Sequence, residues 1–281
     1  LSSCIFFPYY FPMPTFSIHI CLSADVSHLG KVDYSSLPQQ TLMEMAIQGI
    51  VNKHALFGTR DASQDISEWP DVTVNDNQEI LHINWYAYRL QGSFDFQWIP
   101  STVEMCNLDA NFLSGTIDSA VLPRALKRLE IGQNKFSGSF SLTQLPEHVE
   151  VMDVCRNSLS GTLDLTKLPI TLKELWLHVN SFEGTVCLTR LPCSMKVLTL
   201  DNNSLSGALD FTCLPEEMDA ILLSENAFEG ETDFSKLPVT LRELDVSDTE
   251  LSGKICTAHN NFITLRLGNS GVVVDNRREC S

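Results

Sequence analysis

Three residues with reactive side chains recur at one fixed interval in the middle of the chain. Cys155, His178 and Asp201 follow one another at the same spacing of 23 positions. A thiol, an imidazole and a carboxylate are groups that bind Zn²⁺ or activate a nucleophilic sulfur. If each interval returns the chain to a neighbouring strand, these side chains lie about 5 Å apart. Such a site would be open to water and nothing in the sequence fixes the rotamers, so we assign no catalytic residue, metal site or cofactor.

Other sequence motifs of catalysis and phosphate binding do not occur in the chain. It has no glycine-rich phosphate loop, no H-E-x-x-H, no C-x-x-C and no G-x-S-x-G. Its 19 Lys and Arg stand against 35 Asp and Glu, a net charge of −16, and such a chain is unsuited to releasing counterions from a polyanion. We therefore expect a protein that is not an enzyme and that binds neither nucleic acid nor an anionic membrane surface.

The same interval extends over most of the chain, which indicates a repeat architecture. Seven of the 12 prolines, from Pro100 to Pro238, keep this step, and so do eight glycines from Gly92 to Gly253. Residues 77–260 hold eight consecutive units. The elements that position the side chains must therefore be those of one short unit, repeated.

Each unit contains two stretches in which apolar residues alternate with others. The first, as in Leu172, Leu175 and Leu177, predicts a short strand with one buried face, and stacked units then form a parallel sheet with strands about 4.8 Å apart. The second, which begins at a glycine that permits a tight turn, predicts another short strand. An Asn at one fixed position can satisfy the backbone groups of the buried turn. We therefore assign a structural ladder to Asn111, Asn134, Asn157, Asn180, Asn203 and Asn226.

The unit L-P-x-x-L-x-x-L-x-L-x-x-N-x-[FL]-[SE]-G resembles the leucine-rich repeat, in the variety found in plant-type repeats and in many protist proteins. The resemblance implies an α/β repeat solenoid, a horseshoe or arc whose concave face is a parallel β-sheet. Short second strands and irregular turns are then expected on the other side. The unit is one residue shorter than the plant type and has Leu-Pro at its boundary.

Residues 31–78 predict an N-terminal cap for the solenoid. Apolar residues at helical spacing predict a helix over about 37–56, with Ser36 as its capping residue and Gly58 as its end. Trp69, followed by a short edge strand, resembles the helix-plus-Trp cap of plant-type leucine-rich repeats. The paired capping cysteines of that cap are absent, so the cap gives little support for an oxidising compartment.

The two ends of the chain differ from the repeats. Residues 1–30 form an apolar leader, in which positions 1–24 carry no charged side chain and prolines interrupt the apolar runs. We interpret this leader as a signal peptide or its remnant, with a membrane anchor or a disordered leader as alternatives. A secreted or cell-surface protein is therefore expected, with the cytoplasm as the alternative. Residues 261–281 predict a degenerate ninth repeat and a tail.

The residues beside the strand leucines predict a binding surface on the concave face. Apolar residues from four consecutive repeats stand where the strand pattern points to solvent, and Trp176 lies among them; an exposed apolar patch with an aromatic anchor usually marks an interaction site. The acidic residues around them suit a basic or mixed-charge protein segment. The alternative is that the apolar side chains only pack on each other. The candidate site is Val151, Asp153, Glu174, Trp176, His178, Val197, Asp201, Ala220 and Leu222.

The sequence therefore predicts a non-enzymatic scaffold that binds a protein partner through its repeats. One alternative is the recognition part of a larger receptor or enzyme whose effector domain lies outside this chain. Another is a structural surface-coat protein. The oligomeric state is left open.

Overall fold

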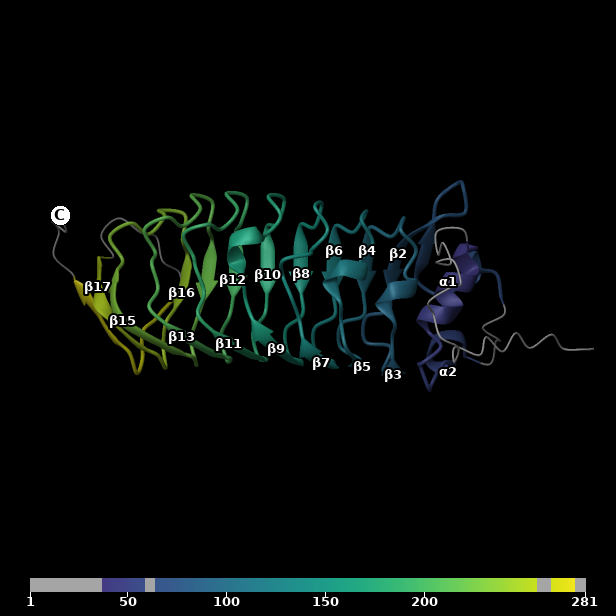
Figure 1. Cartoon of the computed structure of the whole chain (residues 1–281), viewed down its shortest axis with the longest axis horizontal. Coiled ribbons are helices and arrows are strands. Elements are labelled where there is room, and N and C mark those ends of the chain that lie inside the picture. Colours follow the sequence, from purple (N-terminus) through teal and green to yellow (C-terminus); the bar gives the residue numbers. More distant parts are fainter. Residues whose placement is uncertain (1–36, 59–63, 257–263, 276–281) are drawn as a thin grey trace, which may run out of the picture. The chain divides into compact units, whose positions relative to one another are not determined.

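The computed structural model describes residues 37–58, 64–256 and 264–275. The predicted leader, residues 1–30, lies outside the described residues. Two β-sheets account for nearly all of the regular structure, and the chain alternates between them in every repeat. Successive strands of each sheet lie side by side in chain order (Figure 1).

The first sheet has ten strands within the described residues. From β2 onward its strands are parallel. They pair residues 23 positions apart, as Glu174 with Val197, up to β16, whereas β16 and β18 pair residues 21 positions apart. Only β1 is antiparallel, on β2. The strands are β1 (Val72–Val74), β2 (Ile80–Asn84), β4 (Met105–Asn107), β6 (Arg128–Glu130), β8 (Val151–Asp153), β10 (Glu174–Trp176), β12 (Val197–Thr199), β14 (Ala220–Leu222), β16 (Glu243–Asp245) and β18 (Thr264–Arg266).

The second sheet has nine parallel strands among the described residues, and its register differs from that of the first. Ser160 pairs with Ser181, and Ser137 with Ser158, so paired residues are 21 positions apart; in the last pair, β17 with β19, they are 19 apart. The strands are β3 (Gln91–Ser93), β5 (Phe112–Gly115), β7 (Lys135–Ser139), β9 (Ser158–Thr162), β11 (Ser181–Gly184), β13 (Ser204–Gly207), β15 (Ala227–Asp233), β17 (Glu250–Cys256) and β19 (Gly271–Asp275). The predicted solenoid with a parallel sheet and short second strands is confirmed. The second strands do not begin at the repeated glycine as predicted: β11 and β13 end at it, and the residues after Gly161 lead into the single turn Leu165–Lys167.

The core lies between the two sheets. The strand leucines of the first sheet, such as Leu175 and Leu198, are fully buried. They face large side chains from the second sheet, where Phe136, Phe182 and Phe228 alternate with leucines along successive strands. Burying one such side chain stabilises the fold by about 1.5–3 kcal/mol, and because every repeat contributes the same set, each repeat depends on its two neighbours for a complete core.

The Asn residues at the fixed position lie between the sheets, and each bonds to two successive turns, its own and that of the preceding repeat. Asn157 accepts a hydrogen bond from the backbone N–H of Phe136 at 2.9 Å. Its amide donates to the carbonyl oxygens of Ile131 and Val154, both at 3.1 Å. The same pattern holds for Asn111, Asn134, Asn180, Asn203 and Asn226.

The N-terminal region contains two short helices in place of the predicted single helix over about 37–56. They are α1 (Gln39–Ala46) and α2 (His54–Phe57). The helix breaks because the chain between them bonds to the edge of the second sheet: the N–H of Val51 donates to the carbonyl of Gln91, and the N–H of Ser93 donates to the carbonyl of Gly49. These bonds cover the otherwise open edge of β3.

The other helical elements are single turns. They are η2 (Ile66–Glu68), η3 (Phe96–Trp98), η4 (Ser119–Val121) and η5 (Leu165–Lys167). Helix α1 begins after Pro38 without a side-chain cap, and the predicted capping residue Ser36 lies outside the described residues. Across the described ranges, none of the helices has the length and apolar character needed to cross a membrane.

Candidate functional site

The first sheet brings the predicted site residues together on its outward side, on β8 to β14 and the turns that follow them. Strand pairing places Val151, Glu174, Val197 and Ala220 in one row. A second row contains Asp153, Trp176, Thr199 and Leu222. His178 and Asp201 follow β10 and β12, and their backbones are joined through the bond from the N–H of Val179 to the carbonyl of Asp201.

The predicted exposure of the apolar residues is wrong for two of them and too high for the rest. Val151 is only 5% exposed and Ala220 only 8%, whereas Trp176, Val197 and Leu222 are half-buried. Side chains that point the same way on neighbouring strands are about 4.8 Å apart. A short side chain between longer ones therefore loses contact with water, as Ala220 does between Val197 and Glu243.

Trp176 remains the largest apolar side chain on this side of β8 to β14, and its polar neighbours fix its orientation. Its indole N–H lies 3.4 Å from Oε2 of Glu174. The imidazole of His178 lies edge-on to the indole, with the ring centroids 6.1 Å apart. Nδ1 of His178 is in turn 3.0 Å from the hydroxyl of Thr199. These contacts hold the indole of Trp176 in one orientation, so the part of the indole that remains accessible to solvent is already ordered.

The arrangement around Cys155, His178 and Asp201 disfavours an activated thiol. Cys155 is buried, and burial followed by the charge of Asp153 raises the pKa of its thiol, which keeps the sulfur protonated. Burial lowers the pKa of His178 and raises the pKa of Asp201. In the part of the chain that the structure describes, no group of three His, Cys, Asp or Glu residues is arranged to hold a metal ion.

Carboxylates crowd around Gly132, one repeat before Cys155. A Cβ at Gly132 would lie 3.0 Å from Oδ1 of Asp109, Oδ1 of Asp153 and Sγ of Cys155. Burial, and then the charges of Asp153 and Glu130, raise the pKa of Asp109. Within the described residues, the buried Oδ1 of Asp109 has no hydrogen-bond partner. Negative potential is thus concentrated beside the β8 end of the candidate site.

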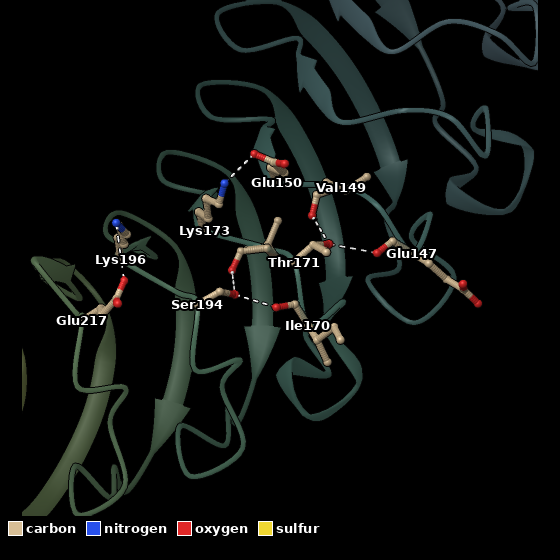
Figure 2. Close-up of polar contacts among 10 residues, drawn as sticks. Glu147, Val149, Glu150, Ile170, Thr171, Lys173, Ser194, Lys196 and Glu217 are labelled. Carbon is tan, nitrogen blue, oxygen red and sulfur yellow. Dashed lines mark hydrogen bonds and ion pairs between the residues drawn. The ribbon is translucent and has the colours of Figure 1, made fainter.

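A series of ion pairs lies along the N-terminal edge of the first sheet, at the residues directly before the strands and, for Glu217, in the loop before β14. Lys173 pairs with Glu150 at 2.7 Å and Lys196 with Glu217 at 3.5 Å (Figure 2). Lys127 pairs with Glu104, and Arg242 with Asp219, in the same way. Sequence reasoning missed this edge because it considered only the positions within and just after the strands. The signal was the charged residue, acidic in some repeats and basic in others, at the position before each strand from β4 to β16.

Hydroxyl groups on the loops before these strands are bound to the backbone. Oγ1 of Thr171 lies 2.9 Å from the carbonyl oxygen of Glu147 and 2.8 Å from that of Val149 (Figure 2). Ser194 and Thr240 make the equivalent pair of contacts in their own repeats. Because these bonds tie each loop to the previous one, they hold the N-terminal edge in a fixed form.

An open groove of about 690 Å³ lies at this edge, alongside β10 to β16. We call it the edge groove. It shares Glu174 and Val197 with the predicted site, and it adds residues from the preceding loops, of which Val239 is 68% exposed. The lining residues are Glu174, Lys196, Val197, Glu217, Asp219, Val239, Thr240 and Arg242.

On β5 to β13, the outward side of the second sheet carries small hydroxyl residues and little charge, and we call this part the hydroxyl face; the charged strands β15 and β17 lie beyond it. Sequence reasoning began the second strand at the glycine, after most of these serines, and therefore missed this face. Apart from Ser114, which donates to the carbonyl of Gly92, the hydroxyls of this face form no side-chain hydrogen bond among the described residues. Its members are Ser114, Thr116, Ser137, Ser139, Ser158, Ser160, Thr162, Ser181, Thr185, Ser204 and Ser206.

Glycines keep the hydroxyl face flat. Gly161, Gly184 and Gly207 have φ values of 102°, 84° and 86°, which L-residues with a side chain rarely adopt. A Cβ at Gly184 would lie 3.3 Å from the methyl carbon of Thr162, so the Thr of one repeat covers the glycine of the next. Lys135 and Glu183 are the charged residues on the strands β5 to β13 that form this face.

Comparison with solved structures places the fold among leucine-rich-repeat solenoids. A plant ice-binding protein superposes with a TM-score of 0.61 at 18% identity, over 83% of this chain and 86% of that one. The PEPR1–AtPEP1 complex gives 0.60 at 19% identity, over 84% of this chain. The leucine-rich-repeat ectodomain of the membrane receptor kinase GASSHO1/SCHENGEN3 from Arabidopsis thaliana, in complex with CASPARIAN STRIP INTEGRITY FACTOR 2, gives 0.57 at 19% identity, also over 84%.

These likenesses are at the level of the fold. This chain spans 42% and 33% of the lengths of the two receptor chains. No protein-family model matches the sequence, and no curated protein sequence matches it.

Proposed function

We propose that this chain is a non-enzymatic scaffold that binds a protein or peptide partner on the outward side of β8 to β14. The observation that carries the proposal is the half-buried Trp176, held by Glu174 and His178 in the middle of a regular sheet. Amphipathic aromatic side chains with an accessible surface are common anchors of protein interfaces. Because the sheet is already ordered, binding there loses little conformational entropy.

The charges around Trp176 favour a basic or mixed-charge partner. Asp153, Glu174 and Asp201 surround it on β8 to β12 and the turns that follow. On the same side, Arg128 pairs with Glu130 and Lys173 with Glu150, while Arg156 lies close enough to act on the imidazole of His178. The three acids outnumber this remaining base. The receptor ectodomain in complex with CASPARIAN STRIP INTEGRITY FACTOR 2 shares the fold and binds that factor. This supports the proposal by analogy of architecture.

The proposal also covers the type of repeat and the cellular location of the protein. We infer a plant-type or protist variety of leucine-rich repeat, in a secreted or cell-surface protein, with the cytoplasm as the alternative. The chain then acts alone or as the recognition part of a larger receptor. A surface-coat role is favoured only if no specific partner is found.

The test is to replace Trp176 with Ala and to measure the affinity of peptides selected on the full chain from a phage-displayed library. We expect a loss of about tenfold or more, as for a central aromatic anchor. Tyr86→Ala is the matched control, because Tyr86 is an exposed aromatic residue beside β2, well before β8. Unchanged affinity of the Trp176→Ala protein would refute the assignment of this site.

A second candidate function is the binding of an ordered, uncharged surface such as ice. The hydroxyl face favours it, because its flat rows of Ser and Thr carry hydrogen-bonding groups that the described residues leave free. The plant ice-binding protein shares the solenoid fold. The test is inhibition of ice recrystallisation by the full chain. Thr162→Arg in the middle of the face should abolish an observed activity and Glu231→Arg should not; equal activity of both variants would refute this function.

A further inference from the structure

We propose that the edge groove binds a short extended segment of the partner that carries an apolar side chain beside a basic one. This inference rests on the proposed protein-binding function and specifies where and how the partner docks. Three independent features carry it: the form of the groove, its exposed apolar residue and its unpaired carboxylate.

The groove has the dimensions of a peptide subsite. Its lining residues come from β10 to β16 and from the loops before those strands. Three strand intervals span about 14 Å, which is the length of roughly four to five extended residues. The hydroxyl of Thr240 is bound to the carbonyl oxygens of Glu216 and Met218, at 2.6 and 3.0 Å, so the wall on that side is already ordered.

Val239 supplies an apolar contact within the groove. It is 68% exposed and follows Pro238 in the loop before β16. Val197 lines the same groove from β12 and is half-buried. An apolar side chain of a ligand that covered both would remove apolar surface from water, the main source of affinity at such contacts.

The charges of the groove favour a basic ligand group at one particular place. Lys196 and Arg242 are already paired with Glu217 and Asp219, both at 3.5 Å. Glu174 is the third acid of the groove, and within the described residues it forms no ion pair. A Lys or Arg of the ligand can therefore pair with Glu174 without displacing an existing partner.

Glu174 also connects the groove to the rest of the candidate site. Its Oε2 lies 3.4 Å from the indole nitrogen of Trp176, so one ligand segment can contact both. Because Glu174 is half-buried, a charge-assisted hydrogen bond there is stronger than one at a fully exposed carboxylate. The basic residue of the partner is thus expected next to the residue that covers Trp176.

The experiment selects binders to the full chain from a phage-displayed library of random linear peptides and sequences them. Enriched peptides should carry Lys or Arg near an apolar residue. Their affinity should fall about tenfold for Glu174→Gln and about fivefold for Val239→Ser. Ile170→Ser and Glu229→Lys are the matched controls: Ile170 holds the same loop position as Val239 but lies outside the groove, and Glu229 is on the second sheet. Both controls should stay within about twofold.

The outcomes separate this inference from the proposed function. If affinity falls for Trp176→Ala but not for Glu174→Gln or Val239→Ser, the edge groove does not bind the peptide. The proposed function then stands and this inference fails. Enrichment of acidic peptides and not basic ones also refutes the inference about the edge groove. If no peptide is enriched on the folded chain, both are overturned. Thermal unfolding of every variant shows whether a loss of affinity reflects a loss of fold.

Discussion

The two sheets of this solenoid use their polar side chains in opposite ways. Along the N-terminal edge of the first sheet, hydroxyls such as that of Thr171 bond to backbone carbonyls, and lysines such as Lys173 pair with acids. On the second sheet, the hydroxyls of Thr162 and Ser181 have no hydrogen-bond partner among the described residues, although they hold equally regular positions in the repeat. A periodic polar residue is therefore not sufficient to indicate a structural role.

The difference teaches where substitution should affect stability and where it should affect binding. A polar group that is bonded internally stabilises the fold, and its loss leaves a partner unsatisfied. A polar group with no internal bond contributes little to stability and is available to a ligand or to water. Each of the following predictions tests this division, and they run from the largest expected effect to the smallest.

Asn157→Ala should be the most damaging of these substitutions. It removes the acceptor of the Phe136 N–H and the donor to the Ile131 and Val154 carbonyls. Each buried group left unsatisfied costs about 1–3 kcal/mol, so the free energy of unfolding should fall by about 3–5 kcal/mol, as measured by urea denaturation. Ser158→Ala, on the next residue of the chain, should change it by less than about 0.5 kcal/mol. Similar effects of the two would contradict the division.

Gly161→Ala should cost about 1–3 kcal/mol, because an L-residue with a side chain is strained in this part of φ space. The φ of Gly161 is 102°, and a Cβ there would lie 2.7 Å from the hydroxyl oxygen of Ser139. Adding Ser139→Gly should recover the steric part of the loss and leave the backbone part. Thermal unfolding of the single and double variants measures both. A harmless Gly161→Ala would show that the hydroxyl face does not need glycine to stay flat.

Thr171→Val and Thr162→Val compare a bonded hydroxyl with a free one at equal size. Thr171→Val should destabilise the protein by about 1 kcal/mol, because its hydroxyl can donate to either of two carbonyl oxygens. Thr162→Val should be within about 0.5 kcal/mol of neutral. The difference in urea midpoint between the two variants is the measurement. Equal losses would mean that Thr162 has a stabilising role that its contacts do not show.

Asp109→Asn should stabilise the protein slightly at pH 7, by about 0.5 kcal/mol, by relieving cross-strand repulsion. The pKa of Asp109 is raised by burial and by Asp153 and Glu130. Its ionisation therefore opposes folding as pH rises from its ordinary pKa of 3.8 through the folded value, and the gain should disappear below that range. Unfolding is to be measured at pH 7 and at about pH 3.

Asp210 has a pKa shift opposite in direction to that of Asp109, so its Asn variant should change stability in the opposite direction. Its carboxylate accepts bonds from the side chain and backbone of Thr212, which lower its pKa. Asp210→Asn should therefore destabilise the protein at pH 7. That loss should fade as pH falls from 3.8 through the lowered folded pKa. The same pH trend for Asp109→Asn and Asp210→Asn would contradict the assignment of these shifts.

The parts of the fold that repeat were predictable from the sequence, because each repeated column has a local physical cause. The alternation at Leu175 and Leu177 predicts a half-buried strand, and the regular step between units predicts stacking. The break after α1 was not predictable, since it depends on Gly49 and Val51 bonding to β3, a strand far along the chain. Local helical spacing contains no information about such a contact.

Strand periodicity predicts where the candidate residues lie on the sheet but not how far each side chain is exposed. Strand periodicity correctly placed Trp176 and Val151 on the outward side. It cannot show that Val151 is buried, because burial there depends on the lengths of Arg128 and Glu174 on the neighbouring strands. The edge groove was missed for a related reason: it forms between loops of different repeats, so no single unit contains it.

The register of the second sheet has a consequence for how its surface can change over time. Equivalent positions of the unit recur at a step of 23, but direct strand partners recur at a step of 21, so Ser139, Ser160 and Ser181 form one straight line from three different positions of the unit. Duplicating a single unit therefore extends several oblique lines at once, each by one residue. A variant that arises at one position and spreads by duplication therefore follows one oblique line and does not fill a row of directly paired residues. A row of directly paired residues such as Ser139, Ser160 and Ser181 stays uniform only if three different positions of the unit carry similar residues.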